Sequence, residues 1–344
     1  MNTLVSYGVA GALLLAVSAY STAGGTDYGA GIWDLLAGRF RHTAEVRALI
    51  DHAMAPVWEA NNVWLVFSAV ICWTGFPLLY ESVFLSLYPL FALALLALIL
   101  RGAFFAFRKV ASSSSSRLLA SRVFGVSSLL APFSFAAALG AIASGKVGVG
   151  GPVVPVWQAC LDPLAIGFGV VALTATAFSG ASFLVGDARR YGAGTDENDE
   201  RPDLVEYFRT RALVAAMALL AVSLVVLVLI AGESPAIFHG MVAGLGLPFA
   251  ITAVLAVLAV AALMWRRVYR WYRVLTVVGV GSFVFAWGFG QVPYVLPGRL
   301  TIEQAAGAPA IEALLLVITV VALVLVVPSL LLLYTLDQRS ALES

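Results

Sequence analysis

The sequence predicts an all-α membrane protein that crosses the bilayer nine times and forms a single integral domain over residues 1–344. Of its residues 61% are hydrophobic and only 11% are charged, whereas a soluble domain carries about 25% charged residues. Apolar segments of about 20 residues, enough to cross the hydrocarbon core, recur along the whole chain. The net charge of +1 hides a third signal, which is an uneven distribution of basic residues between alternate loops.

Nine apolar segments are long enough to span. The first is preceded by no Lys or Arg, whereas a secretory signal starts with a basic leader, so we expect a retained helix. The second and third are expected to join through a tight turn at residues 80–82. The predicted spans are residues 3–23, 61–80, 82–107, 118–144, 160–184, 210–232, 240–264, 274–293 and 309–335.

Basic residues distinguish the two sides of the predicted membrane domain. When successive loops are placed on alternate sides, 18 of the 20 Lys and Arg residues fall on one side, and only Lys146 and Arg299 fall on the other. Cytoplasmic loops carry an excess of basic residues. We therefore expect the N-terminus outside and the C-terminus inside. One missed helix would scramble this division, so the division also supports nine spans.

Three connections have recognisable character. Residues 24–60 are predicted to be a cytoplasmic connection, with an amphipathic helix within 32–53 that lies along the membrane interface. The stretch 186–209 is acidic and reads as a solvated cytoplasmic loop. Residues 288–312 are expected to form an ordered external loop, in which Thr301 and Gln304 suit the capped start of a short helix.

Residues 265–273 mix two Trp and two Tyr with four Arg. Aromatic rings with a polar edge favour the headgroup region, and basic side chains favour anionic lipid. We interpret this stretch as an interfacial belt that contacts membrane lipid.

A polar patch stands at the start of the second predicted span. Glu59, Asn61 and Asn62 lie between Trp58 and Trp64, directly before a mostly apolar stretch. Charged groups inside a membrane helix cost up to about 2.5–3.5 kcal/mol on insertion scales. Such groups are retained where they pair with a partner or line a polar path, so this patch is the first candidate site.

Two further ionisable groups are predicted at the same membrane level, namely Asp27 after the first span and Arg101 in the third. A carboxylate beside an arginine can hold or relay a proton, because burial disfavours its charge and the arginine favours it. The alternatives are a static pair of Glu59 with Arg101, or an Arg101 side chain that extends to the membrane surface.

The chain offers no evident set of metal or haem ligands. All three histidines, His42, His52 and His239, fall in predicted loops or at helix ends, and Cys72 and Cys160 lie in different segments. A haem needs axial ligands placed within a helix bundle. We therefore expect this chain to ligate no metal or haem iron by itself. Nothing in the sequence indicates nucleic-acid binding.

Four separated stretches resemble one family. They are GGTDYGAGIWDLLAG at 24–38, PVWEANNVWLV at 56–66, WGFGQVPYVLPGRLTIEQAAGAP at 287–309 and VVPSLLLLY at 326–334. In order and spacing they resemble subunit II of the cytochrome bd-type quinol oxidases, over nearly the whole chain. The sequence departs from the family pattern at Gly24, where an acid is usual, and at Ala60 and Asn62.

The resemblance implies two four-helix bundles plus a peripheral helix, in a prokaryotic cell membrane. It implies a complex that oxidises quinol and reduces oxygen to water. The haems, either b-type with a d-type haem or b-type alone, would be held by a partner, subunit I, and small single-helix subunits can attach. Subunit II would line polar paths from the cytoplasm, and Trp58 and Trp64 could approach a cofactor of the partner.

Two other functions fit a bundle with few charges. A secondary transporter would place rare charges among its helices in the same way, but transporters often carry internal repeats, and the stretch 56–64 has no counterpart in the other half. A purely structural membrane partner would have no proton role. A visible haem spectrum and a co-purifying large subunit would separate an oxidase from a transporter.

Overall fold

The computed structural model is almost entirely helical and describes residues 2–37, 43–54, 58–111, 113–192 and 202–338. Eight helices of the described part are long and apolar enough to cross a membrane. The chain is thus an all-α multi-pass membrane protein. These eight are α1 (Asn2–Ala37), α4 (Pro77–Val110), α5 (Ser114–Ala143), α7 (Pro163–Gly192), α8 (Pro202–Glu233), α10 (Leu247–Trp265), α11 (Tyr272–Gly290) and α13 (Pro309–Gln338). A further helix of 18 residues, α3 (Trp58–Gly75), is not among them.

The first helix is longer than the sequence indicates. It was expected to end at residue 23, but α1 continues to Ala37 without a break, so the predicted connection over 24–60 is wrong in its first part. The reason is close packing at glycine. A Cβ atom on Gly29 would lie 2.0 Å from the backbone oxygen of Thr176, and one on Gly180 would lie 2.5 Å from the carbonyl carbon of Gly29. These glycines let α1 and α7 touch backbone to backbone.

The expected interfacial helix is a separate element, α2 (Thr43–Met54). Its apolar residues Val46, Leu49 and Ile50 are fully buried in a core that includes residues of α1, α7 and α8. The amphipathic pattern was therefore recognised correctly, but the apolar face of α2 packs against the protein itself.

The boundary between the second and third predicted spans also differs. α3 ends at Gly75 and α4 begins at Pro77, so the turn lies at Phe76 and not at residues 80–82. Proline suits the first turn of a helix because its missing N–H would have no partner there. The predicted turn residue Ser82 lies within α4 and donates to the Leu78 oxygen at 2.6 Å.

The segment predicted as one helix over 240–264 is divided. A short helix α9 (Pro235–Val242) precedes α10, and residues 243–246 connect them. Other predicted helices are extended, since α7 and α8 reach into the expected acidic loop and leave 193–201 outside the described residues.

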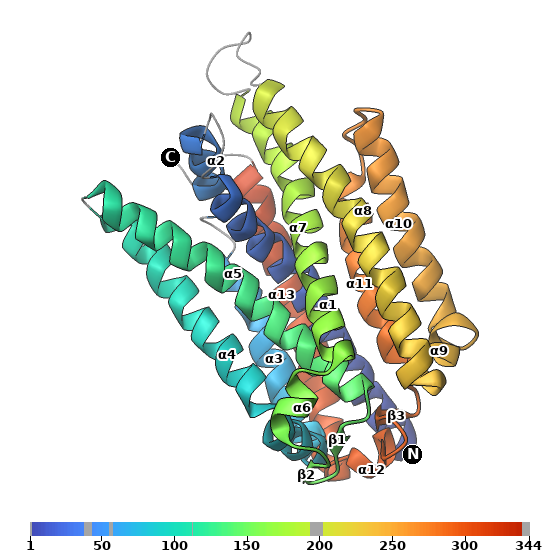
Figure 1. The fold of residues 1–344 in the computed structure, drawn as a ribbon. Coiled ribbons are helices and arrows are strands. Elements are labelled where there is room, and N and C mark those ends of the chain that lie inside the picture. The colour runs from blue at the N-terminus through green and yellow to red at the C-terminus, as the bar shows by residue number, and fades with distance from the viewer. Residues whose placement is uncertain (1, 38–42, 55–57, 112, 193–201, 339–344) are drawn as a thin grey trace.

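Small elements gather at one end of the bundle (Figure 1). They comprise the hairpin of β1 (Val147–Gly148) with β2 (Gly151–Pro152), α6 (Val156–Cys160), the hairpin of β3 (Tyr294–Leu296) with β4 (Leu300–Thr301), and α12 (Ile302–Ala305). Thr301 and Gln304 form the expected capping box at the start of α12.

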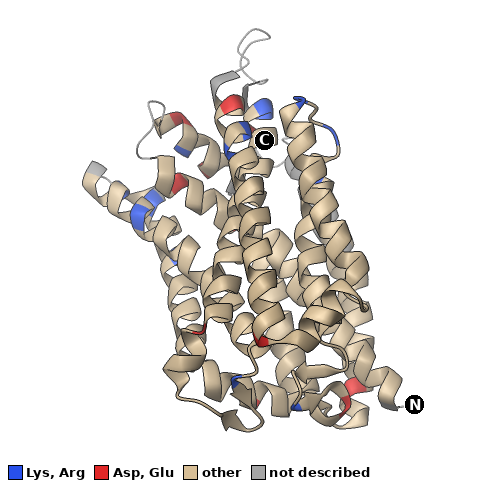
Figure 2. Cartoon of the chain, turned by 45° about the vertical axis from the view of Figure 1, so that its right-hand side comes forward, with Lys and Arg blue, Asp and Glu red and all other residues tan. Residues whose placement is uncertain are grey.

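The start of α1 and the end of α13 lie at opposite ends of the bundle, and charged residues are concentrated toward the two ends (Figures 1 and 2). α1 is central, since it contacts α3, α5, α7, α11 and α13. A nine-span topology, its orientation and the division into two four-helix bundles remain predictions.

Candidate functional site

Two ion pairs bridge α1 and α4, one above the other. Asp27 pairs with Arg101, and Asp34 pairs with Arg108. Both the two acids and the two arginines are seven residues apart. Seven residues make about two helical turns, roughly 10.5 Å along the axis, so each helix presents its pair on one face.

The Asp27–Arg101 pair is buried and fully bonded. The Arg101 Nη1 and Nη2 atoms lie 3.1 Å from Asp27 Oδ2 and 3.0 Å from Asp27 Oδ1. Nη2 also donates to the Asp27 backbone oxygen at 3.0 Å, and Nε donates to Ser128 Oγ of α5 at 3.0 Å. The side chains are 9% and 5% exposed. Such a two-pronged pair is the strong form of a charged hydrogen bond.

The second pair connects the interior with the surface. Arg108 Nη1 donates to Asp34 Oδ2 at 2.7 Å, and Arg108 also pairs with Asp51 of α2. Arg47 of α2 lies with its Nε atom 3.2 Å from Asp34 Oδ1. The Asp34 side chain is 0% exposed, whereas that of Asp51 is 46% exposed. Charged groups therefore run from the surface at α2 into the bundle.

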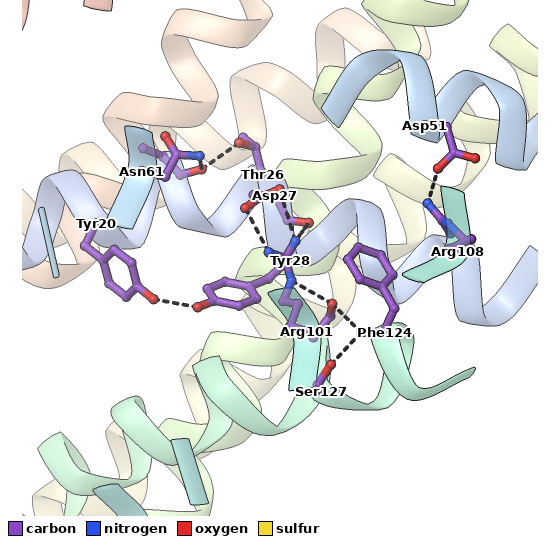
Figure 3. A network of polar contacts seen from close by, with 12 residues as sticks. Tyr20, Thr26, Asp27, Tyr28, Asp51, Asn61, Arg101, Arg108, Phe124 and Ser127 are labelled. Carbon is purple, nitrogen blue, oxygen red and sulfur yellow. Dashed lines mark hydrogen bonds and ion pairs between the residues drawn. The ribbon is translucent and has the colours of Figure 1, made fainter. Parts of the chain in front are cut away.

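Aromatic rings pack against both arginines. The Phe124 ring centroid lies 4.9 Å from the Arg101 guanidinium carbon and 5.1 Å from that of Arg108. Tyr28 stacks on Arg101 at 4.9 Å, and its hydroxyl lies 2.5 Å from the hydroxyl of Tyr20. Cations over aromatic faces are stabilised when water is excluded. Figure 3 shows the Asp51–Arg108 pair on one side of Phe124 and the group of Asp27, Arg101, Tyr28 and Tyr20 on the other.

The start of α3 joins this site through Asn61, whose Nδ2 atom donates to the Ala23 oxygen of α1 at 3.2 Å. Asn61 is buried, Asn62 is half-buried and Trp64 is 9% exposed. Glu59 and Trp58 lie in the first turn of α3 by their backbone. Their side chains lie outside the described part of the chain.

The sequence named both Asp27 and Arg101 as candidates but did not pair them with each other. Arg101 was considered as a partner of Glu59 or as a side chain that extends to the membrane surface. It is 4% exposed and pairs with Asp27, so it does not extend to the surface, whereas a pairing with Glu59 lies outside the described residues. The Asp34–Arg108 pair, with Arg47 and Asp51, was missed altogether. The repeated seven-residue spacing was a signal that could have indicated it.

The described histidines do not fit a haem. His52 of α2 and His239 of α9 are both exposed and lie toward opposite ends of the bundle. In the part of the chain that the structure describes, no three His, Cys, Asp or Glu side chains gather as a metal site. These residues offer no axial ligand set within the bundle.

Comparisons with known proteins agree on one family. The family model for cytochrome bd terminal oxidase subunit II matches residues 5–337. Cytochrome bd ubiquinol oxidase subunit 2 of Bacillus subtilis (strain 168) is 34% identical over 84 residues, so the match spans about a quarter of that relative, 24% of each chain. A chain of the bd oxidase structure from Geobacillus thermodenitrificans superposes with a TM-score of 0.73 at 12% identity, over 98% of both chains, which shows a shared fold.

Proposed function

Because the chain belongs to the cytochrome bd terminal oxidase subunit II family, we propose that it is the membrane partner of a haem-bearing subunit I, in a complex that oxidises quinol and reduces oxygen to water. The haems, b-type with a d-type, are assigned to the partner. This assignment agrees with the described histidines, which are exposed and far apart. The family match over residues 5–337 supports this assignment.

The contribution of this chain is a path for protons toward the partner's oxygen-reducing centre. Oxygen reduction consumes protons, and groups that exchange them must line any route into a membrane protein. The observation that supports this role is a set of groups that can exchange protons, placed at successive levels of the bundle. It comprises Asp51, whose carboxylate is half-exposed, then Asp34, Asp27 and the part-buried hydroxyl pair of Tyr28 and Tyr20.

Each member has a distinct part. Arginine keeps its proton in proteins. Arg101 and Arg108 therefore stabilise the ionised form of the aspartates and do not exchange protons themselves. The carboxylates and the tyrosine hydroxyls can exchange them. Glu59 would add a second access from the start of α3, since Asn61 in the same helix bonds α1 four residues before Asp27.

A static role is the second candidate, and a specific observation favours it. Both carboxylate oxygens of Asp27 are bonded by Arg101, which also bonds the Asp27 backbone and Ser128. A carboxylate with all of these bonds can hold α1, α4 and α5 together without exchanging protons.

The rate of oxygen consumption by the assembled complex distinguishes the proton path from the static role. In the purified two-subunit complex, Glu59→Gln should slow quinol-driven oxygen consumption on the order of 10²-fold, the scale of a removed acid–base group. Glu59→Asp should recover part of the rate, because a carboxylate is retained. Asp34→Asn should slow turnover as well, with the haem spectrum unchanged.

The matched control is Glu206→Gln, which removes a carboxylate that is 45% exposed on α8 and pairs with Arg209. It should leave the rate per haem unchanged. If Glu59→Gln and Asp34→Asn complexes assemble fully and turn over normally across pH, the proton path is refuted and the static role stands.

A further inference from the structure

The connection between α10 and α11 is strongly basic and exposed. Residues 265–273 contain four Arg, two Trp and no acid. The Trp265 and Trp271 side chains are 76% and 65% exposed. Arg266 and Arg270 are exposed beside them. Nothing in the proposed oxidase function uses this turn.

The turn has a defined shape. Arg267 and Trp271 have φ values of 57° and 63°, a left-handed conformation that is uncommon for residues other than glycine. Arg273 anchors the turn to α7, since its Nη2 atom lies 2.6 Å from Asp187 Oδ1. Arg189 of α7 stacks on the Tyr269 ring at 4.6 Å. These contacts preform the surface that the turn presents.

Two of the four arginines have no carboxylate partner among the described residues. Arg273 has Asp187, and Arg267 lies 3.4 Å from Glu206, which Arg209 shares. Among the described residues no carboxylate pairs with Arg266 or Arg270, although Arg270 lies 6.0 Å from the centroid of the Trp271 ring. Two free guanidinium groups therefore stand between two exposed indoles.

We propose that this turn is a binding site for the headgroup phosphate of an anionic phospholipid. Guanidinium forks match phosphate oxygens, and indole rings favour the depth at which lipid headgroups lie. Val268, which is 44% exposed, and the two indoles add apolar surface that a free anion would not use. A zwitterionic lipid carries the same phosphate, but its ammonium group is repelled by the arginines.

Native mass spectrometry of the full chain in detergent tests this site, with phosphatidylglycerol and phosphatidylcholine as the probes. The chain should retain phosphatidylglycerol in preference to phosphatidylcholine. The variant Arg266→Gln/Arg270→Gln should bind phosphatidylglycerol about 25-fold more weakly, and each single variant about fivefold, from the usual contribution of one basic residue near an anionic lipid. Binding of phosphatidylcholine should not change.

The control variant Arg122→Gln/Arg299→Gln removes the same amount of charge from two exposed arginines elsewhere. This variant should still retain phosphatidylglycerol in preference to phosphatidylcholine. Equal retention of the two lipids by the unaltered chain would overturn the proposal, as would an unchanged preference in the Arg266→Gln/Arg270→Gln variant. Millimolar inorganic phosphate should not displace the lipid. If it does, the turn binds free anions and the lipid assignment is wrong.

Discussion

Asp27 and Arg101 are buried charges that compensate one another inside the bundle. Removing one partner of such a pair leaves the other charge without compensation, which costs about 3–5 kcal/mol. Asp27→Asn should therefore lower the stability of the purified chain by that amount. Asp27→Asn/Arg101→Gln should recover much of the loss, because the unpaired cation is also removed. Denaturant unfolding in detergent, read by circular dichroism, measures both.

The exposed Glu206 pair provides the comparison at this scale, since Glu206→Gln should cost at most about 1 kcal/mol. If Asp27→Asn costs no more than Glu206→Gln, or if the double variant is as unstable as the single one, the compensation of charge is not what holds Asp27 and Arg101 together.

The sequence could identify the residues of this site better than their pairing. Arg101 was named because charge is costly in a membrane helix, and Asp27 because it follows the first span at the same predicted membrane level; both arguments need only the sequence. Their partnership depends on which faces α1 and α4 turn toward each other. Hydropathy does not contain that information. Asp34 was missed because the stretch around it was interpreted as lying outside the membrane.

At the scale of single elements, the length of α1 depends on its glycines. Gly29→Ala would place a methyl group 2.0 Å from the Thr176 oxygen, so α1 and α7 must move apart. Overpacking of this kind costs about 1–3 kcal/mol, and a lower thermal unfolding midpoint of the purified chain should report it.

Gly11→Ala is the matched change in the same helix, because no atom lies within 4 Å of the position of its Cβ atom. It should be neutral or stabilise by up to about 1 kcal/mol, since alanine favours a helix over glycine. Equal effects of the two substitutions would contradict a close-packed contact at Gly29.

The same glycines explain where helix prediction failed. Each of the nine predicted apolar segments is mostly helical, because a long apolar run has few other structures available. The predicted helix boundaries were wrong where a helix is surrounded by other helices and not by lipid. Residues 24–37 are rich in glycine and polar groups, which resemble a loop when lipid contact is assumed, yet Gly29 and Gly31 there face α7 and α5.

At the scale of the whole molecule, the 18-to-2 division of basic residues predicts an orientation that labelling can test. In a chain whose native Cys72 and Cys160 are changed to alanine, we expect Thr195→Cys to react from the cytoplasmic side of sealed vesicles and Glu303→Cys from the outside. Glu303 suits this purpose because it is exposed, whereas Thr301 caps α12. Reaction of both from one side would refute the nine-span topology.

The two ion pairs between α1 and α4 also constrain how the chain is made. Each joins residues that are 74 positions apart. At a synthesis rate of 5–20 residues per second, the acids of α1 emerge about 4–15 s before their arginines. During that interval Asp27 and Asp34 have no cation from α4 to match them. The second half of α1 can therefore complete its two ion pairs with α4 only after α4 has been synthesised, however early α1 enters the membrane.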